Sequence, residues 1–274
     1  MNGKQARCAE DGGTTQSAMA RPNPDAPPPA AAAAGRHLTN NSATHAATRP
    51  ATLAIRLDTT LAALRQQARP DRLVALAGFG LNPDQRLGLS VPALRALARQ
   101  IGHDHDLALA LCDTGIPDAQ ILAAYLAEPA RFSVAQMNHW ISRLQAWDSC
   151  DQACTNAFAP SPLAWGRVPV WARRAAPFER RAGFALLAAL AVHDKAAADA
   201  PFLASLACIE AAADDDRPYV RKGVNWALRQ IGKRNATLLP AAIACAEGLQ
   251  RRPSRAARWI AADALRELRA RCPS

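Results

Sequence analysis

From residue 59 onward, proline and glycine divide the sequence into short blocks that have the composition of helices. The blocks are rich in Ala, Leu and Arg and poor in β-branched and aromatic residues, which favours helix over strand. Ser90 and Ser133 stand where N-caps are expected, and Pro92 and Pro117 suit first turns. The blocks predict about twelve helices, at residues 59–69, 71–78, 91–101, 104–113, 117–127, 133–145, 148–157, 178–192, 199–213, 217–232, 237–249 and 254–271.

Many short helices with short connections are typical of a solenoid, in which successive helix pairs stack. No strict repeat length is visible, so we expect an all-α superhelical solenoid of degenerate pairs. Such a stack has a concave face that can follow an extended ligand. A compact irregular helical bundle is the alternative.

The first fifty residues differ from the rest of the chain, because they contain one Leu and no Ile, Val or aromatic residue. Such a segment cannot bury enough apolar surface to offset its ordering entropy. We therefore expect residues 1–50 to be disordered and residues 51–274 to form one domain. The segment is a poor signal peptide, because its apolar run is short. It is also a poor transit peptide, because the acidic residues Glu10, Asp11 and Asp25 interrupt the segment.

Composition narrows the possible chemistry and location. No apolar run reaches the roughly 18 residues of a membrane span, so we expect no membrane contact. Cys150 and Cys154 lack the further ligands that zinc requires, and the seven cysteines are odd in number and scattered. Free thiols in a reducing, cytoplasmic setting are the preferred interpretation. The sequence has no phosphate loop, HExxH motif or nucleophile elbow, and we predict no metal and no cofactor.

The net charge of +10 is concentrated in one region. Residues 217–258 contain ten cations and one acid, Glu247, so this region carries +9 and the rest about +1. Solvated faces usually mix charges, so the excess indicates a surface for a polyanion. The cations are Arg217, Arg221, Lys222, Arg229, Lys233, Arg234, Arg251, Arg252, Arg255 and Arg258.

The predicted helix at 217–234 places a tryptophan among cations. At 100° per residue, Trp226 shares a face with Lys222, Arg229 and Lys233. The aliphatic residues of the helix lie on the other side and form a complete apolar face without Trp226. Burial therefore does not explain why this indole stands on the polar face. The indole would pack on nucleic acid while the cations meet phosphates. The alternative is a tryptophan that covers a helix seam and contacts Arg229 by a cation–π interaction.

A second cluster lies at residues 140–151. On a continuous helix, Trp140, Leu144, Trp147 and Asp151 share one face. The tryptophans are then candidates for the core, but an ionised Asp151 at the end of an apolar stripe needs a partner. Arg181, on an apolar stripe of its own, would pair with such a carboxylate or with a phosphate. Asp148 is an alternative N-cap for the helix that follows.

Four segments together resemble the DNA alkylation repair family, the AlkD-type alkylpurine DNA glycosylases. They are GLSVPALRALARQIG at 88–102, WDSCDQAC at 147–154, FERRAGFALLAALAVHDK at 178–195 and RPYVRKGVNWALRQIGKRN at 217–235. The resemblance runs from about residue 79 to 271. It implies a superhelix of HEAT-like repeats with a basic concave face that grips duplex DNA.

The resemblance also implies roles for individual residues. Trp147 and Trp226 match the two aromatic residues of the lesion site, and Asp151 matches the catalytic carboxylate. Arg181 matches an arginine that contacts the DNA backbone. We assign further phosphate contacts to the basic helix: Lys222, Arg229, Lys233 and Arg234.

Two features depart from the family pattern. Phe178 stands where the family often has tryptophan, and no motif is recognisable in residues 51–78, where its first DNA-contacting helices fall.

The implied reaction is hydrolysis of the N-glycosidic bond of N3- or N7-alkylated purines in duplex DNA, by a monomer. Such a base is already cationic, so it needs no general acid to leave, and Asp151 would stabilise positive charge on the deoxyribose. The resemblance implies no pocket for a flipped base. A non-catalytic helical-repeat scaffold that binds nucleic acid or protein is the alternative function.

Overall fold

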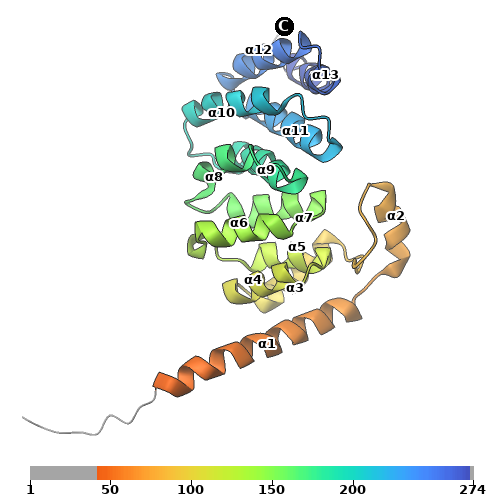
Figure 1. The fold of residues 1–274 in the computed structure, drawn as a ribbon, viewed down its shortest axis with the longest axis vertical. Coiled ribbons are helices and arrows are strands. Elements are labelled where there is room, and N and C mark those ends of the chain that lie inside the picture. Colours follow the sequence, from red (N-terminus) through yellow and green to blue (C-terminus); the bar gives the residue numbers. More distant parts are fainter. Residues whose placement is uncertain (1–41, 272–274) are drawn as a thin grey trace, which may run out of the picture. The chain divides into compact units, whose positions relative to one another are not determined.

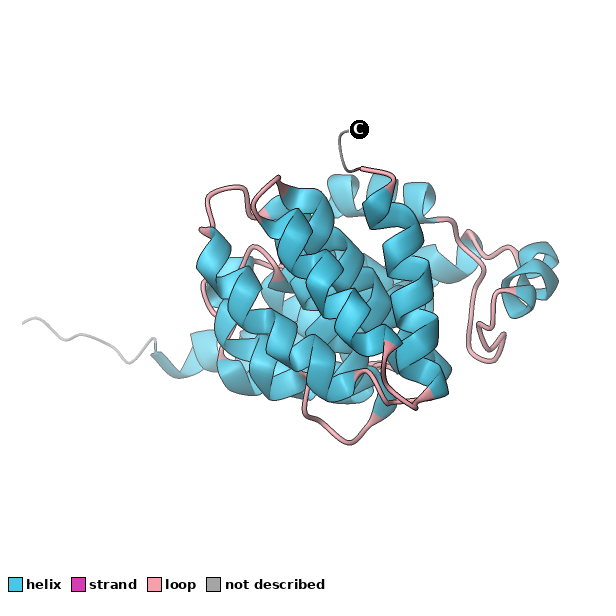
Figure 2. Ribbon diagram, turned by 90° about the horizontal axis from the view of Figure 1, so that it is seen from above, coloured by secondary structure: helices cyan, strands magenta, loops and turns pink. Residues whose placement is uncertain are grey.

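The computed structural model describes the backbone of residues 42–271 and the side chains from Thr52 to Arg271. Within these residues the protein is helical and contains no strand (Figures 1 and 2), which confirms the all-α prediction. The α-helices are α1 (Ser42–Gln66), α2 (Leu73–Gly78), α3 (Val91–Ile101), α4 (His105–Asp113), α5 (Pro117–Leu126), α6 (Val134–Arg143), α7 (Trp147–Gln152), α8 (Ala164–Trp171), α9 (Pro177–His193), α10 (Asp199–Ala212), α11 (Pro218–Arg234), α12 (Leu238–Gln250) and α13 (Arg255–Arg269). Two 3-10 helices, η1 (Pro70–Arg72) and η2 (Pro129–Arg131), and a π-helix, η3 (Ala153–Phe158), complete the elements.

The helices from α4 to α13 are stacked in two rows (Figure 1). Helices α5, α7, α9, α11 and α13 each contact the next along one row, and α4, α6, α8, α10 and α12 accompany them. This is the predicted stack of helix pairs. It places residues of α7, α9 and α11 side by side, although they are far apart in sequence.

Several predicted helix ends are confirmed. The Ser90 side chain accepts a hydrogen bond from Ala93 N and caps α3, and Ser133 forms a capping box at α6. The start of helix α1 does not match the prediction. The helix begins at Ser42, ahead of the predicted domain start at residue 51. Residues 1–41 of the segment predicted to be disordered lie outside the described residues.

Helix α8 was not predicted, because its sequence AWGRVPVW contains Pro169, Gly166 and two tryptophans. Burial of Val168 and Trp171 against the next helix outweighs this poor helix propensity. The two helices approach closely at Gly183 of α9, where a Cβ atom would lie 2.5 Å from Ala172 N. A glycine is therefore required at this position.

The predicted blocks at 133–145 and 148–157 are separate helices, so the condition of a continuous helix, under which Trp140, Leu144, Trp147 and Asp151 share one face, is not met. Helix α6 ends at Arg143, Leu144 has extended backbone, and α7 starts at Trp147. Trp140 is consequently buried, as predicted, in a chain of edge-to-face rings that includes Phe132, Phe158 and Trp171. Trp147 is free of this core and is only half-buried.

None of the described helices is both long enough and apolar enough to span a bilayer.

Gly183→Ala tests the close contact between α8 and α9. The new methyl group meets backbone atoms of Trp171 and Ala172, so we expect a loss of about 1–3 kcal/mol in the free energy of unfolding. Gly166→Ala is the matched control, because a Cβ there meets nothing within 4 Å, and helix propensity predicts a gain of about 0.5–1 kcal/mol. Urea denaturation measures both free energies of unfolding. Equal changes in the two variants would contradict the requirement for glycine at position 183.

Candidate functional site

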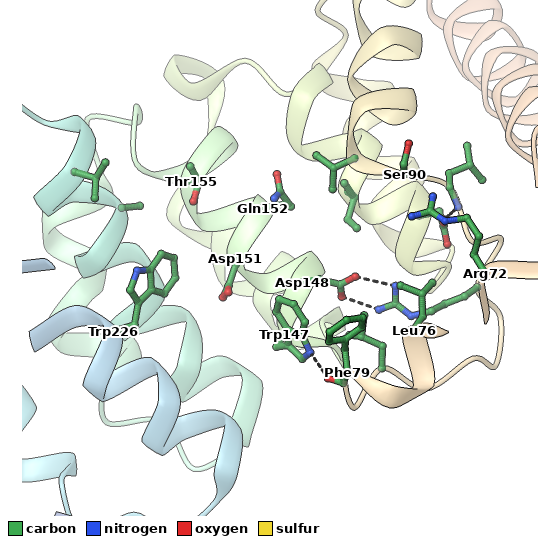
Figure 3. Close-up of a pocket in the computed structure, with 18 of the residues that line it drawn as sticks. Arg72, Leu76, Phe79, Ser90, Trp147, Asp148, Asp151, Gln152, Thr155 and Trp226 are labelled. Carbon is green, nitrogen blue, oxygen red and sulfur yellow. Dashed lines mark hydrogen bonds and ion pairs between the residues drawn. The ribbon is translucent and has the colours of Figure 1, made fainter. Parts of the chain in front are cut away.

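The three residues predicted to carry the chemistry lie around one hollow. Trp147 and Asp151 of α7 and Trp226 of α11 all line a cavity of about 670 Å³. Figure 3 shows Asp151 between the two indoles, with Trp226 on one side and Trp147 on the other. The break after α6 and the packing of α7 and α11 on α9 bring them together.

Asp151 is held by a bidentate ion pair with Arg181 of α9. Arg181 Nε and Nη2 donate to its two carboxylate oxygens at 3.0 and 2.7 Å, and Nη1 donates to the Tyr219 carbonyl at 2.7 Å. The side chains of Asp151 and Arg181 are 18% and 7% exposed. The sequence left open whether Arg181 pairs with a carboxylate or with a phosphate. In the structure Arg181 pairs with the Asp151 carboxylate.

The charge state of Asp151 is set by two opposing effects. Burial raises the pKa of the Asp151 carboxyl above its ordinary value, because it disfavours the ionised form, and Arg181 partly offsets this. For Arg181, burial lowers the pKa, but the attraction of Asp151 and the hydrogen bonds to it act in the opposite direction and the pKa is raised overall, so the guanidinium stays protonated. The site thus presents an acid that is harder to ionise than an exposed aspartate.

A smaller cavity of about 310 Å³ adjoins Asp151. It is lined by Phe79, Trp147, Asp151, Arg181, Tyr219, Lys222 and Trp226. Four aromatic side chains therefore surround a carboxylate and two cations. The larger cavity is lined partly by residues of α2 and of the loop that follows it, where the sequence shows no motif.

The basic helix α11 is oriented as predicted. Its aliphatic residues are buried, and Lys222 is exposed beside the site. Arg229 and Lys233, on the same helix, are both paired with Glu267 of α13, at 2.8 Å each. Their charges are thus largely compensated within the protein. The local sequence did not reveal Glu267 as their partner.

Arg234 requires a correction. Its guanidinium donates to the carbonyl oxygens of Ala191 and Ala197 and lies over the Phe202 ring. These contacts tie the end of α11 to α9 and to the start of α10, so Arg234 has a structural role instead of the predicted phosphate contact.

Other cations of residues 217–258 are also compensated. Arg217 pairs with Asp215 at 2.6 Å, and Arg252 pairs with Asp214 at 3.3 Å. Both acids precede the basic stretch in sequence, so the net charge of the stretch overstates its free charge.

Three residues of the site were not predicted from the sequence: Phe79, Arg86 and Tyr219. Arg86 is buried and forms a bidentate pair with Asp148, at 2.8 and 2.6 Å. Asp148 therefore anchors the segment before α3, whereas we considered it an N-cap. The available signals were the W-D pair at 147–148 and the 217–235 segment, which contains Tyr219 but gave it no role; Phe79 lies in no recognisable pattern.

The described residues show no group of three or more His, Cys, Asp or Glu side chains arranged to hold a metal ion. Cys150 and Cys154 are buried free thiols whose sulfur atoms face the carbonyl oxygens of Phe178 and Ala182. Cys150 of α7 and Cys154 of η3 thus lie where these two elements contact α9.

Two comparisons with known proteins gave matches. The family model described as "DNA alkylation repair enzyme" matches residues 60–270. A solved structure described as "A new family of proteins related to the HEAT-like repeat DNA glycosylases with affinity for branched DNA structures" is 17% identical in sequence, with a TM-score of 0.64; the match covers 77% of this chain and 94% of that chain. This likeness shows a HEAT-like repeat fold. No curated protein sequence gives a significant match.

The pKa of Asp151 provides a test of the ion pair. We expect Asp151 to titrate above the ordinary value of about 3.9, and to titrate higher still in Arg181→Met, which removes the group that opposes burial. NMR titration of the carboxyl carbon measures both. Because the folded state then binds the proton more tightly than the unfolded state, Asp151 lowers the free energy of unfolding as pH rises from the ordinary pKa through the folded pKa.

Asp215 is an internal control in the same spectra. The hydrogen bond from Arg217 lowers its pKa, and this value should be unchanged in Arg181→Met. A wild-type pKa of Asp151 at or below about 3.9 would mean that Arg181 outweighs burial.

Proposed function

This chain belongs to the DNA alkylation repair enzyme family, and on that premise we propose that it is a DNA glycosylase that releases N3- and N7-alkylated purines from duplex DNA. The observation that carries the proposal is the position of Asp151, between Trp147 and Trp226 and in contact with Arg181. A carboxylate framed by aromatic faces suits the stabilisation of a cationic sugar.

The reaction needs only a stabilised cation and a water molecule. The N-glycosidic bond breaks with its electron pair going to the alkylated base, which leaves neutral, and the deoxyribose gains positive charge. Asp151 would stabilise that charge and orient the water that adds to the sugar, whose proton passes to solvent. The attraction is strong because Asp151 is largely removed from water.

Arg181 acts mainly through Asp151. A guanidinium has five N–H donors, and three of them are used on Asp151 and on the Tyr219 carbonyl. Its first role would be to keep Asp151 ionised and oriented, while the other N–H groups remain for a phosphate. Trp147 and Trp226 would contact the edge of the sugar.

DNA would be held mainly by cations that the protein does not itself neutralise. Lys222 is exposed and lines the cavity at Asp151, which suits a phosphate beside the damaged nucleotide. Arg229 and Lys233 would contribute less, because their charges are already compensated by Glu267.

A second candidate function is non-catalytic binding of DNA. The structural neighbour is described as having affinity for branched DNA, and as related to the glycosylases. Release of free alkylpurine from methylated duplex DNA, compared with retention of a four-way junction, separates the two functions.

Asp151→Asn should abolish release of 7-methylguanine from duplex DNA and leave DNA affinity nearly unchanged. The substitution removes the negative charge that opposes the sugar cation but keeps the shape of the side chain. Single-turnover release and fluorescence anisotropy measure the two quantities. Asp58→Asn, at an exposed position of α1, is the control. Release at the wild-type rate by Asp151→Asn would remove this carboxylate from the mechanism.

Lys222→Ala should reduce the slope of log Kd against log salt concentration by about 0.9, the value expected for one lost phosphate contact. Lys233→Ala should change the slope less, because its ammonium is already 2.8 Å from Glu267. Binding isotherms at several salt concentrations give both slopes. Equal slopes for the two variants would rule out the selective role of Lys222.

A further inference from the structure

Helix α2 ends in a turn that reaches the site from a part of the sequence without a recognisable motif. The turn consists of Gly78, Phe79 and Gly80, and Phe79 lines both cavities beside Asp151. We propose that Phe79 is a further DNA-contacting residue, which stacks on an unpaired base of the damaged base pair. This inference rests on the proposed function, because it takes the substrate to be damaged duplex DNA.

The turn is fastened to the two helices that carry the site. The indole Nε1 of Trp147 donates to the Phe79 carbonyl at 3.2 Å, and the Tyr219 hydroxyl donates to the Gly80 carbonyl at 2.7 Å. One side chain comes from α7 and the other from α11. The position of Phe79 is therefore set by the same residues that surround Asp151.

The backbone of the turn also requires a glycine. Gly80 has a φ of +74°, in the left-handed region, and a Cβ there would lie 3.2 Å from the Tyr219 hydroxyl oxygen. The chain thus closes tightly at the point where Tyr219 holds it. Phe79 is left as the side chain that the turn presents.

The Phe79 side chain is poorly covered by the protein. The residue is 71% exposed, although it is large and apolar. Figure 3 shows its ring beside Trp147, on the side of Asp151 away from Trp226. Exposed apolar side chains next to a binding cavity are typical of contact surfaces.

The chemistry of the surroundings points to a nucleobase. Lys222, an exposed cation that lines the smaller cavity together with Phe79, favours an anionic partner. Within DNA, the bases offer the flat faces on which an aromatic ring can stack, and proteins use apolar wedges at unstacked base steps. A base whose partner is damaged is the easiest to unstack.

The test uses a duplex in which 2-aminopurine stands opposite a tetrahydrofuran abasic analogue. This probe has no base to release, so it reports contact without chemistry. Stacking is worth about 1–3 kcal/mol per base, so Phe79→Ala should raise the Kd about tenfold and abolish the change in 2-aminopurine fluorescence on binding. Phe79→Trp should retain both, since it restores an aromatic face.

Val74→Ala is the matched control on the same helix. Val74 is 84% exposed but lines neither cavity, so its variant should bind and report like the wild type. Tyr219→Phe removes only the hydroxyl that holds Gly80 and should raise the Kd in the same direction as Phe79→Ala, by a smaller factor. Thermal unfolding of each variant verifies that the fold is intact.

Wild-type affinity and fluorescence in Phe79→Ala would overturn the inference, whatever the enzyme does to alkylpurines. Conversely, absence of alkylpurine release by the wild type, together with a tenfold loss of binding in Phe79→Ala, would reject the glycosylase proposal and support the DNA contact.

Discussion

The ion pair between Asp151 and Arg181 is the interaction on which the site depends. Arg181 spans three successive helices of one row, since it donates to the carboxylate on α7 from its own place on α9 and to the Tyr219 carbonyl at the start of α11. A buried carboxylate without this partner would carry a large desolvation cost. The pair therefore makes an ionised aspartate possible at this depth, and it also joins the helices that hold the two tryptophans.

The stacking of helix pairs explains why the site is built from distant parts of the sequence. In one row, each helix contacts the next, so residues of α7, α9 and α11 share a surface. Helix α9 is buried over most of its length and acts as the common support. The site residues are then carried by packed helices and not by loops, which suits a site whose geometry must be maintained. The turn after α2 is the exception, and it is held by hydrogen bonds from two aromatic side chains of the row.

Charge in this protein is used in two ways that the sequence does not distinguish. Some cations of the basic stretch fasten helices together, as Arg234 does through carbonyl oxygens and Arg229 through Glu267. Others, such as Lys222, are exposed next to the site. A net charge of +9 over residues 217–258 predicts a surface for a polyanion, but it does not show which of the cations are already paired within the protein.

The sequence by itself determined the helical class, most helix positions, and the outward face of the 217–234 helix, because capping residues and hydrophobic periodicity act within one helix. It also indicated Trp147, Asp151 and Trp226 through their resemblance to known motifs. Only the tertiary structure decided that Arg181 pairs with Asp151, that Glu267 compensates Arg229 and Lys233, and that Phe79 reaches the site. It also formed α8 in spite of its sequence. The reason is physical: these features depend on contacts between residues that are distant along the chain, and the register of one helix against another is not encoded in the local pattern of either.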